Sequence, residues 1–300
     1  MALMAEDTIM DFQPQLILIY FIPVFAVFMA AELVWLRAQG AGHPESADYT
    51  LKDTISNGFL ALFHEIGDGI AALVVISIYY SLFDFRLFTI PNSAWAFLLL
   101  FLLQDFLYYW FHRASHRIRW MWASHVVHHS SEKLNFSTAF RQSLTYPISG
   151  MWVFWLPLIA LGFDPMTVIM VVLLNLAYQF FLHTQVVDKL GVLEGILNTP
   201  SHHRVHHARN EQYIDKNYAG TLIIWDKLFG TFVEERDDIP CDYGITRQID
   251  THNPIELTFH EWKDMFADVF NAENGLAGGI KHLWMPPEWQ PEVSQSRSVV

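Results

Sequence analysis

Residues 94–116 read AWAFLLLFLLQDFLYYWFHRASH, an apolar run with one acidic residue, Asp105, that ends in two histidines four positions apart. At a helical rise of 1.5 Å per residue, the segment 93–111 is long enough to cross the hydrocarbon core of a bilayer, about 30 Å thick. Spacings of three and four place five side chains on one stripe of such a helix: Asp105, Tyr108, Tyr109, His112 and His116. The stretch therefore predicts a membrane helix that presents two imidazoles on one side near its carboxyl end.

Two further histidine clusters repeat this helical spacing. The three clusters have the forms HxxxH, HxxHH and HxxHH, and they comprise His112 and His116; His125, His128 and His129; and His203, His206 and His207. Residues three or four apart share a helix face, so each cluster aims its imidazoles in one direction. Imidazole is a common ligand of zinc, copper, iron and nickel. We expect these eight histidines to be metal ligands and catalytic residues of a site for two metals.

Residues around the clusters carry further expectations. His183 ends an apolar segment one turn after Gln179 and is expected to be a ninth ligand, while the role of His202 stays open. Asp105 either holds the far N–H of a ligand or makes a polar contact between helices. Isolated histidines are interpreted as bystanders, namely His43, His64, His252, His260 and His282. Arginines near the clusters are expected to face lipid phosphates or to mark the cytoplasmic side, namely Arg113, Arg117, Arg119, Arg204 and Arg209.

The composition favours a membrane protein. Hydrophobic residues make up 52% and charged residues 16% of the 300-residue chain, against about 25% charged residues in typical soluble domains. The formal net charge of −13 argues against a nucleic-acid partner. The single cysteine, Cys241, excludes an intrachain disulfide, a cysteine-based zinc finger and a four-cysteine iron–sulfur cluster. No GxGxxG motif is present, so electrons for a redox reaction would come from a partner or a diffusible reductant.

Apolar segments predict four or five transmembrane helices, at 16–36, 57–82, 93–111, 146–163 and 166–182. The last two are also compatible with a hairpin that only partly enters the membrane. Basic residues gather between the third and fourth segments and after His183, which predicts that the histidine-rich loops and the C-terminal region are cytoplasmic. We expect N-terminal membrane spans (1–90), a catalytic region (91–235) and a cytoplasmic C-terminal region with a loosely ordered tail (236–300). The expected fold is an all-α integral membrane protein whose cytoplasmic helical cap holds the di-metal site.

At the three clusters the chain resembles the fatty acid hydroxylase / sterol desaturase superfamily, from about residue 104 to 233. The stretches TPSHHRVHHARN (199–210) and IDKNYAGTLIIWDKLFGTF (214–232) are most similar to its alkylglycerol monooxygenase branch and the bacterial relatives of that branch. The resemblance implies a membrane di-iron enzyme that uses O2 to hydroxylate or desaturate a fatty acyl, alkylglycerol or sterol-like lipid. It also implies two iron ions as cofactors, and tetrahydrobiopterin or a small redox protein as the electron donor.

Two other functions fit the same residues. A zinc-dependent lipid hydrolase or lyase is one alternative, because zinc has no redox role but can activate water. A non-catalytic membrane interaction protein that retains its metals is the other. Iron content with O2 consumption separates the oxygenase from both.

Overall fold

The computed structural model describes residues 16–273 and 275–291, and in these residues the chain is helical, as the sequence predicts. The β pairing in the described part is limited to two isolated bridges, Leu197–Leu222 and Ala208–Tyr243. The α-helices are α1 (Ile17–Gln39), α2 (Leu51–Phe83), α3 (Ala94–Arg117), α4 (Arg119–His129), α5 (Tyr146–Ser149), α6 (Leu156–Leu161), α7 (Pro165–Phe180), α8 (Pro200–His207), α9 (Ile224–Phe229), α10 (Pro254–Phe270) and α11 (Gly275–Gly279). The 3-10 helices are η2 (Gly40–Gly42), η3 (Glu45–Ala47), η4 (Phe136–Phe140), η5 (Met151–Trp155), η6 (Gly191–Gly195) and η7 (Ile280–Leu283).

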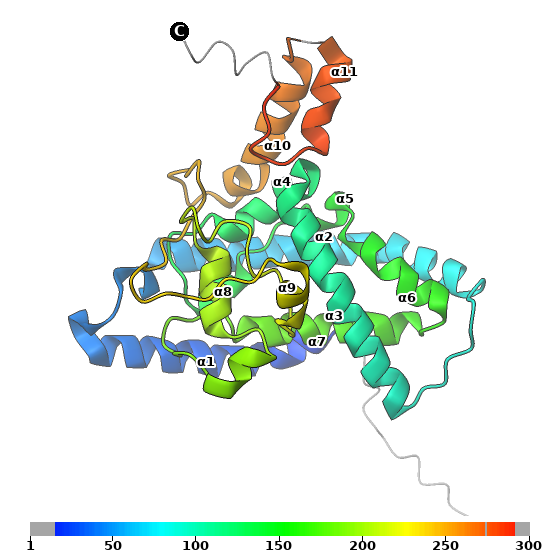
Figure 1. Cartoon of the computed structure of the whole chain (residues 1–300), viewed down its shortest axis with the longest axis horizontal. Coiled ribbons are helices and arrows are strands. Elements are labelled where there is room, and N and C mark those ends of the chain that lie inside the picture. Colours follow the sequence, from blue (N-terminus) through cyan, green and yellow to red (C-terminus); the bar gives the residue numbers. More distant parts are fainter. Residues whose placement is uncertain (1–15, 274, 292–300) are drawn as a thin grey trace, which may run out of the picture.

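Three helices of the described part, α1, α2 and α3, are long and apolar enough to cross a membrane. Large apolar side chains on α1 and α2 point away from the protein, among them Val27, Val34 and Leu73, each more than 60% exposed. Such exposure suits helices whose outer faces contact lipid. Figure 1 shows α1 and α7 side by side with α3 crossing them, and both α1 and α3 pack against α7.

The segment 146–163 is not the continuous fourth span that its apolar character predicts. It divides into α5, η5 and α6, with breaks at Gly150 and Gly162, whose φ angles of 88° and 114° are left-handed. Pro147 and Pro157 lie in the first turns of α5 and α6, where the missing N–H of proline is tolerated. The fifth segment forms α7, whose 16 residues extend about 24 Å.

The hairpin made by α6 and α7 nevertheless reaches the loop that joins α2 to α3. The backbone N–H of Leu87 in this loop donates to the carbonyl of Ala160 at 2.8 Å. A Cβ atom at Gly162 would lie 2.0 Å from the carbonyl oxygen of Phe88, so the close approach requires glycine. The α6–α7 hairpin therefore reaches the region between the C-terminal end of α2 and the N-terminal end of α3.

A single extended residue redirects the chain between α3 and α4. Ile118 has φ −120° and ψ 114°, so α3 stops at Arg117 and α4 begins at Arg119 in a new direction. The third histidine cluster lies on α8, which begins after Thr199 with Pro200 in its first turn; the Thr199 hydroxyl accepts from the backbone N–H of His202. These breaks turn the histidine faces of α3, α4 and α8 toward each other.

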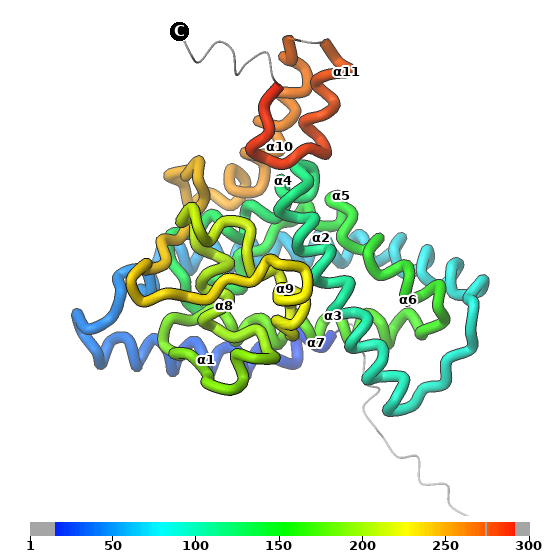
Figure 2. Tube along the Cα trace, in the orientation of Figure 1, coloured from blue at the N-terminus to red at the C-terminus, as the bar shows by residue number. Residues whose placement is uncertain are grey.

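The C-terminal region forms a helical hairpin, α10 and α11, that extends beyond the bundle above α4 (Figure 2). The buried side of α10 packs on α4 through Trp262 and Met265. The predicted loose tail falls largely on 292–300, outside the described residues. Before it, the ring of Trp289 lies 4.9 Å from that of His282.

Candidate metal centre

The nine histidines predicted as ligands meet in the interior of the protein as two groups. The ligand nitrogens within each group all lie within 4.8 Å of one another. The first group consists of His112, His116, His125, His129 and His206, and the second consists of His128, His183, His203 and His207. All nine side chains are buried. His183, which belongs to none of the three sequence clusters, comes into place because α7 ends beside α4 and α8.

Backbone carbonyls fix the orientation of four of these imidazoles. A carbonyl oxygen can only accept a hydrogen bond, so the Nδ1 atom that contacts it must carry the proton. The Nδ1–oxygen contacts are His112 to Tyr218 (2.8 Å), His128 to Arg141 (3.2 Å), His183 to Gln179 (2.8 Å) and His206 to Lys216 (3.0 Å). In the neutral ring, Nε2 then has a free lone pair that faces the centre of its group.

Burial keeps these rings neutral. It lowers the pKa of His128 and His206 well below the usual 6.5, and neighbouring imidazoles lower the pKa further. Burial also lowers the pKa of His183, to about 4. Neutral imidazole is the form that binds a metal, so the protein presents these nitrogens ready for coordination.

The resulting arrangement of lone pairs fits metal ions. The Nε2 atoms of His128 and His183 lie 3.2 Å apart, although both nitrogens are acceptors. Two lone pairs at this distance repel unless a cation lies between them. Nitrogens that bind one metal at about 2.0–2.1 Å are themselves about 3 Å apart, which matches this spacing. Nε2 of His116 and of His206 is likewise buried without a hydrogen-bond partner among the described residues.

Three buried carboxylates, which the sequence did not single out, hold the segments that orient the histidines. Asp226 accepts from the backbone N–H groups of Tyr218 and Ala219, both at 2.8 Å, and the Tyr218 carbonyl orients His112. Asp53 pairs with the guanidinium of Arg141 at 3.3 Å, and the carbonyl of Arg141 contacts His128.

The third carboxylate belongs to α1. Glu32 accepts from the hydroxyl of Thr184, the residue after His183, and from the backbone N–H of Phe136 at 2.9 Å. An acidic residue within an apolar helix is costly in a bilayer and normally faces the protein interior. No local pattern predicts this contact with the loop beside His183, because Thr184 lies 152 positions after Glu32 in the sequence.

Side chains from outside the groups also contact the histidines directly, among them Gln142, whose amide nitrogen lies 3.3 Å from Nδ1 of His128. The Tyr146 hydroxyl lies 2.6 Å from Nδ1 of His125. Asp215 lies 3.4 Å from Nδ1 of His116 and pairs with Arg117. Burial raises the pKa of Asp215, but its hydrogen bonds with His116 and Arg117 outweigh burial and lower that pKa to about 2.

The structure decides between the two alternatives for Asp105 and corrects the expectation that the arginines face lipid phosphates. Asp105 contacts no histidine of either group. Its carboxylate accepts from the side-chain amide of Asn175 on α7 and from the indole of Trp225 on α9, so the polar contact between helices is the correct alternative. Four arginines expected to face lipid phosphates are paired with carboxylates instead, as Arg117–Asp215, Arg119–Glu261, Arg204–Glu235 and Arg209–Asp242, and Arg113 donates to the Tyr109 hydroxyl. These guanidinium groups pair with carboxylates from distant segments because charge-assisted hydrogen bonds satisfy them within the protein.

The remaining histidines lie outside both groups. His202 points away from His203, and its Nε2 atom lies 2.9 Å from Glu194. His43 contacts Asp48, and the ring of His64 lies 5.6 Å from that of Tyr146. His260, expected to be a bystander, lines a large cavity beside the metal centre.

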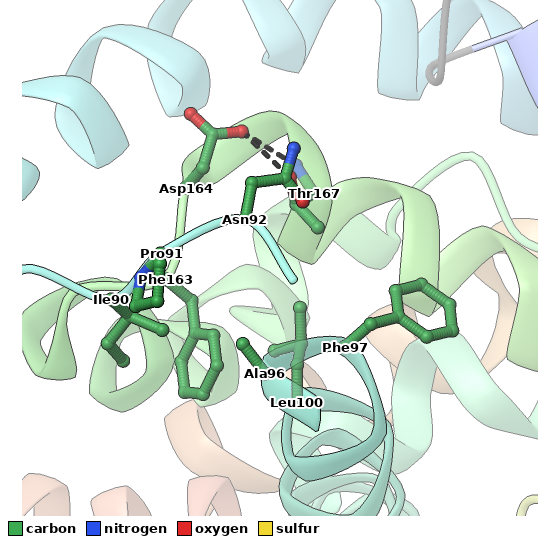
Figure 3. A pocket seen from close by; sticks show the side chains of 9 residues that line it. All are labelled: Ile90, Pro91, Asn92, Ala96, Phe97, Leu100, Phe163, Asp164 and Thr167. Carbon is green, nitrogen blue, oxygen red and sulfur yellow. Dashed lines mark hydrogen bonds between the residues drawn. The ribbon is translucent and has the colours of Figure 1, made fainter. Parts of the chain in front are cut away.

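That cavity has a volume of about 800 Å³ and reaches the histidines from the side of α10. His116, His129, His206 and His207 contribute to its lining, so it gives both groups access to molecules from outside. A volume of this order accommodates a small molecule. A second cavity, of about 40 Å³, lies near the start of α3 around Leu100 (Figure 3). His112 lies twelve positions after Leu100, about 18 Å along the helix, so this second cavity belongs to a different part of the molecule.

Comparisons with known proteins agree with this geometry. Residues 97–231 match the family model described as fatty acid hydroxylase, and this range contains all nine histidines of the two groups. The region that matches this family model therefore contains both groups, and the match confirms the resemblance seen at the histidine clusters.

Similarity to curated relatives extends beyond residues 97–231. The chain is 42% identical to alkylglycerol monooxygenase of Homo sapiens over 273 residues, which cover 90% of this chain and 59% of that protein. It is 41% identical to the Danio rerio alkylglycerol monooxygenase over the same shares of both chains. The ornithine lipid hydroxylase OlsE of Rhizobium tropici is 30% identical over 148 residues, 49% of this chain and 44% of its own. The chain thus spans about three fifths of the alkylglycerol monooxygenases of Homo sapiens and Danio rerio, and no solved structure matches it.

Proposed function

We propose that this protein is a membrane-bound di-iron oxygenase that uses O2 to hydroxylate a lipid. The observation that carries the proposal is the pair of buried groups in which neutral imidazoles direct their lone pairs at one another. One group of five and one of four nitrogens provide ligands for two metal ions. The match of residues 97–231 to the fatty acid hydroxylase family model and the similarity to alkylglycerol monooxygenase and ornithine lipid hydroxylase favour iron over zinc, and oxidation over hydrolysis.

Each group would hold one iron. Bound iron supplies the redox chemistry with O2 that oxidation of a C–H bond requires. The protein contributes orientation: backbone carbonyls hold Nδ1 of four histidines, and the Tyr146 hydroxyl contacts Nδ1 of a fifth, His125. Such contacts fix the ring and its tautomer and strengthen the ligand.

A lipid with an ether-linked or acyl chain is the proposed substrate, and an alkylglycerol is the first compound to test, because two alkylglycerol monooxygenases match over 90% of this chain. The electron donor is proposed to be tetrahydrobiopterin or a small redox protein. Either would approach from outside the membrane, on the side where the 800 Å³ cavity reaches the histidines. We place this side in the cytoplasm, because basic residues gather in the histidine-rich loops.

The test uses the full chain in lipid nanodiscs, loaded with Fe(II) or with Zn(II). Each form is given an alkylglycerol, a fatty acyl lipid or a sterol, with tetrahydrobiopterin in one arm and a ferredoxin with its reductase in another. We expect O2 consumption and a product with one added oxygen atom from the iron form alone. Turnover by the zinc form without O2, or no O2 consumption by the iron form in any arm, would contradict the proposal.

A further inference from the structure

Helix α10 carries an exposed apolar stripe in addition to its buried face. Ile255, Phe259, Phe266 and Phe270 are 61%, 44%, 38% and 74% exposed. They follow each other at intervals of four, seven and four residues, which places them on one side of the helix. Four large apolar side chains in a row on a surface indicate contact with a partner or a membrane rather than with water.

The stripe is not needed to attach α10 to the rest of the protein. Another side of the helix performs that role: Leu257 packs against Leu60 of α2, and Met265 packs against Ala123 of α4. The helix is therefore amphipathic in an unusual way, because one apolar face is buried in the protein and a second remains exposed.

A buried ion pair fixes the direction of the stripe. Arg119, only 2% exposed, donates to Glu261 at 2.7 Å and to Asp268 at 2.6 Å. Both carboxylates belong to α10, whereas Arg119 begins α4. Truncating one member of such a pair would leave a buried charge without a partner, so α10 is held in one rotational setting on α4.

The stripe continues the surface at which the candidate span α3 ends. Trp120 lies three residues after Arg117, the last residue of α3, and its ring lies 6.2 Å from that of Phe266. The indole N–H of Trp120 donates to the carbonyl of Ile148, whose own side chain is 62% exposed. Tryptophan is enriched where membrane helices leave the hydrocarbon core.

We propose that α10 is an interfacial helix whose apolar stripe lies in the headgroup region of the bilayer that α3 crosses. Glu256 and Asp264 lie on the outward sides of α10, so attraction to anionic lipids does not drive this contact. Burial of the four apolar side chains does, and a zwitterionic surface suffices. Lys263, next to the stripe, can extend its ammonium group toward the lipid phosphates.

This placement gives α10 a second role beside the metal centre. His260, Glu261 and Asp264 of the same helix line the 800 Å³ cavity that reaches His116 and His129. The helix thus stands between the membrane surface and this cavity. Its placement requires only that the chain crosses a membrane, and it holds whether or not the oxygenase proposal is correct.

The test measures which side of α10 contacts lipid. Cys241 is replaced by serine, and cysteines are introduced singly as Phe266→Cys, Phe259→Cys and, as the matched control on the polar side, Asp264→Cys. Each variant is labelled with a small fluorophore in phosphatidylcholine nanodiscs that contain spin-labelled lipid. All three positions are exposed, so labelling does not require disruption of the core.

We expect lipid quenching several-fold stronger at positions 266 and 259 than at 264, and strongest for a spin label near the headgroup end of the acyl chain. Equal quenching at all three positions would overturn the proposal. So would a disulfide-linked dimer through position 266 that forms in place of quenching, because the stripe would then contact a second copy of the chain.

Discussion

The two histidine groups differ in how they are built and in what surrounds them. The first group draws its five histidines from the three sequence clusters and borders the large cavity through His116, His129 and His206. The second depends on His183, a single histidine beyond the end of α7, and only His207 of its members lines that cavity. Spacing along one helix identifies candidate ligands on that helix, whereas a single candidate such as His183 is identified only from the position at which its helix ends. The comparison also predicts that the two metals can be removed separately.

Loss of a central ligand should have the largest effect. His128→Ala in the second group and His206→Ala in the first should each reduce lipid oxidation by more than the roughly 100-fold typical of residues that only support ligands. Product formation in nanodiscs is the measurement. His43→Ala, which removes a histidine that lies outside both groups and contacts Asp48, is the matched control and should keep full turnover. Full turnover by either of the first two variants would remove that histidine from the site.

His183→Ala tests the independence of the groups. The second group would retain three histidines and should lose its metal, while the five histidines of the first group keep theirs. Metal analysis of the purified variant should therefore find half of the wild-type content. Unchanged metal content would show that His183 is not a ligand, and complete loss would show that the groups do not bind independently.

Asp226→Asn should have a smaller effect that is confined to the first group. The amide that replaces the carboxylate has one acceptor oxygen instead of two for the backbone N–H groups of residues 218 and 219, so the Tyr218 carbonyl holds His112 less firmly. We expect a loss of about 10–100-fold in the affinity of one metal, measured by competition with a chelator. Asp188→Asn, at an exposed position, is the control. Equal weakening of both metals would point to a general loss of stability instead.

His202→Ala should leave both metals in place, although His202 is adjacent to a ligand in the sequence. Its Nε2 atom contacts Glu194, and neither group includes it. The expected cost is about 1.5–3 kcal/mol of folding free energy, from loss of the hydrogen bond between His202 and the half-buried carboxylate of Glu194. Chemical denaturation and metal analysis check the two halves of this prediction. Loss of a metal would place His202 among the ligands.

The sequence predicts the helical fold and the nine candidate histidines because the helices and the candidate residues can be recognised from patterns of neighbouring residues. Helical spacing places His125, His128 and His129 on one helix whatever the rest of the chain does. The supporting carboxylates could not be predicted in the same way. Asp226 acts through the backbone of residues 218 and 219, and Glu32 acts through Thr184, far away in the sequence.

The apolar segment 146–163 and the arginines were mispredicted for different reasons. The hydrophobicity of this segment predicts a span, but prolines and left-handed glycines divide it into short helices. Arg119 resembles a lipid-facing residue at the end of a span until α10 supplies Glu261 and Asp268. Partners from distant segments decide the contacts of the arginines, whereas prolines and glycines within 146–163 divide that segment.

Metal stoichiometry tests the central claim most directly. The full-length wild-type protein, purified in nanodiscs after expression with iron, is analysed for iron and zinc per chain, alongside His128→Ala and His206→Ala. Two buried groups of neutral imidazoles predict two iron ions per wild-type chain and one in each variant. A single metal per wild-type chain, or two metals retained in both variants, would contradict the two-group centre.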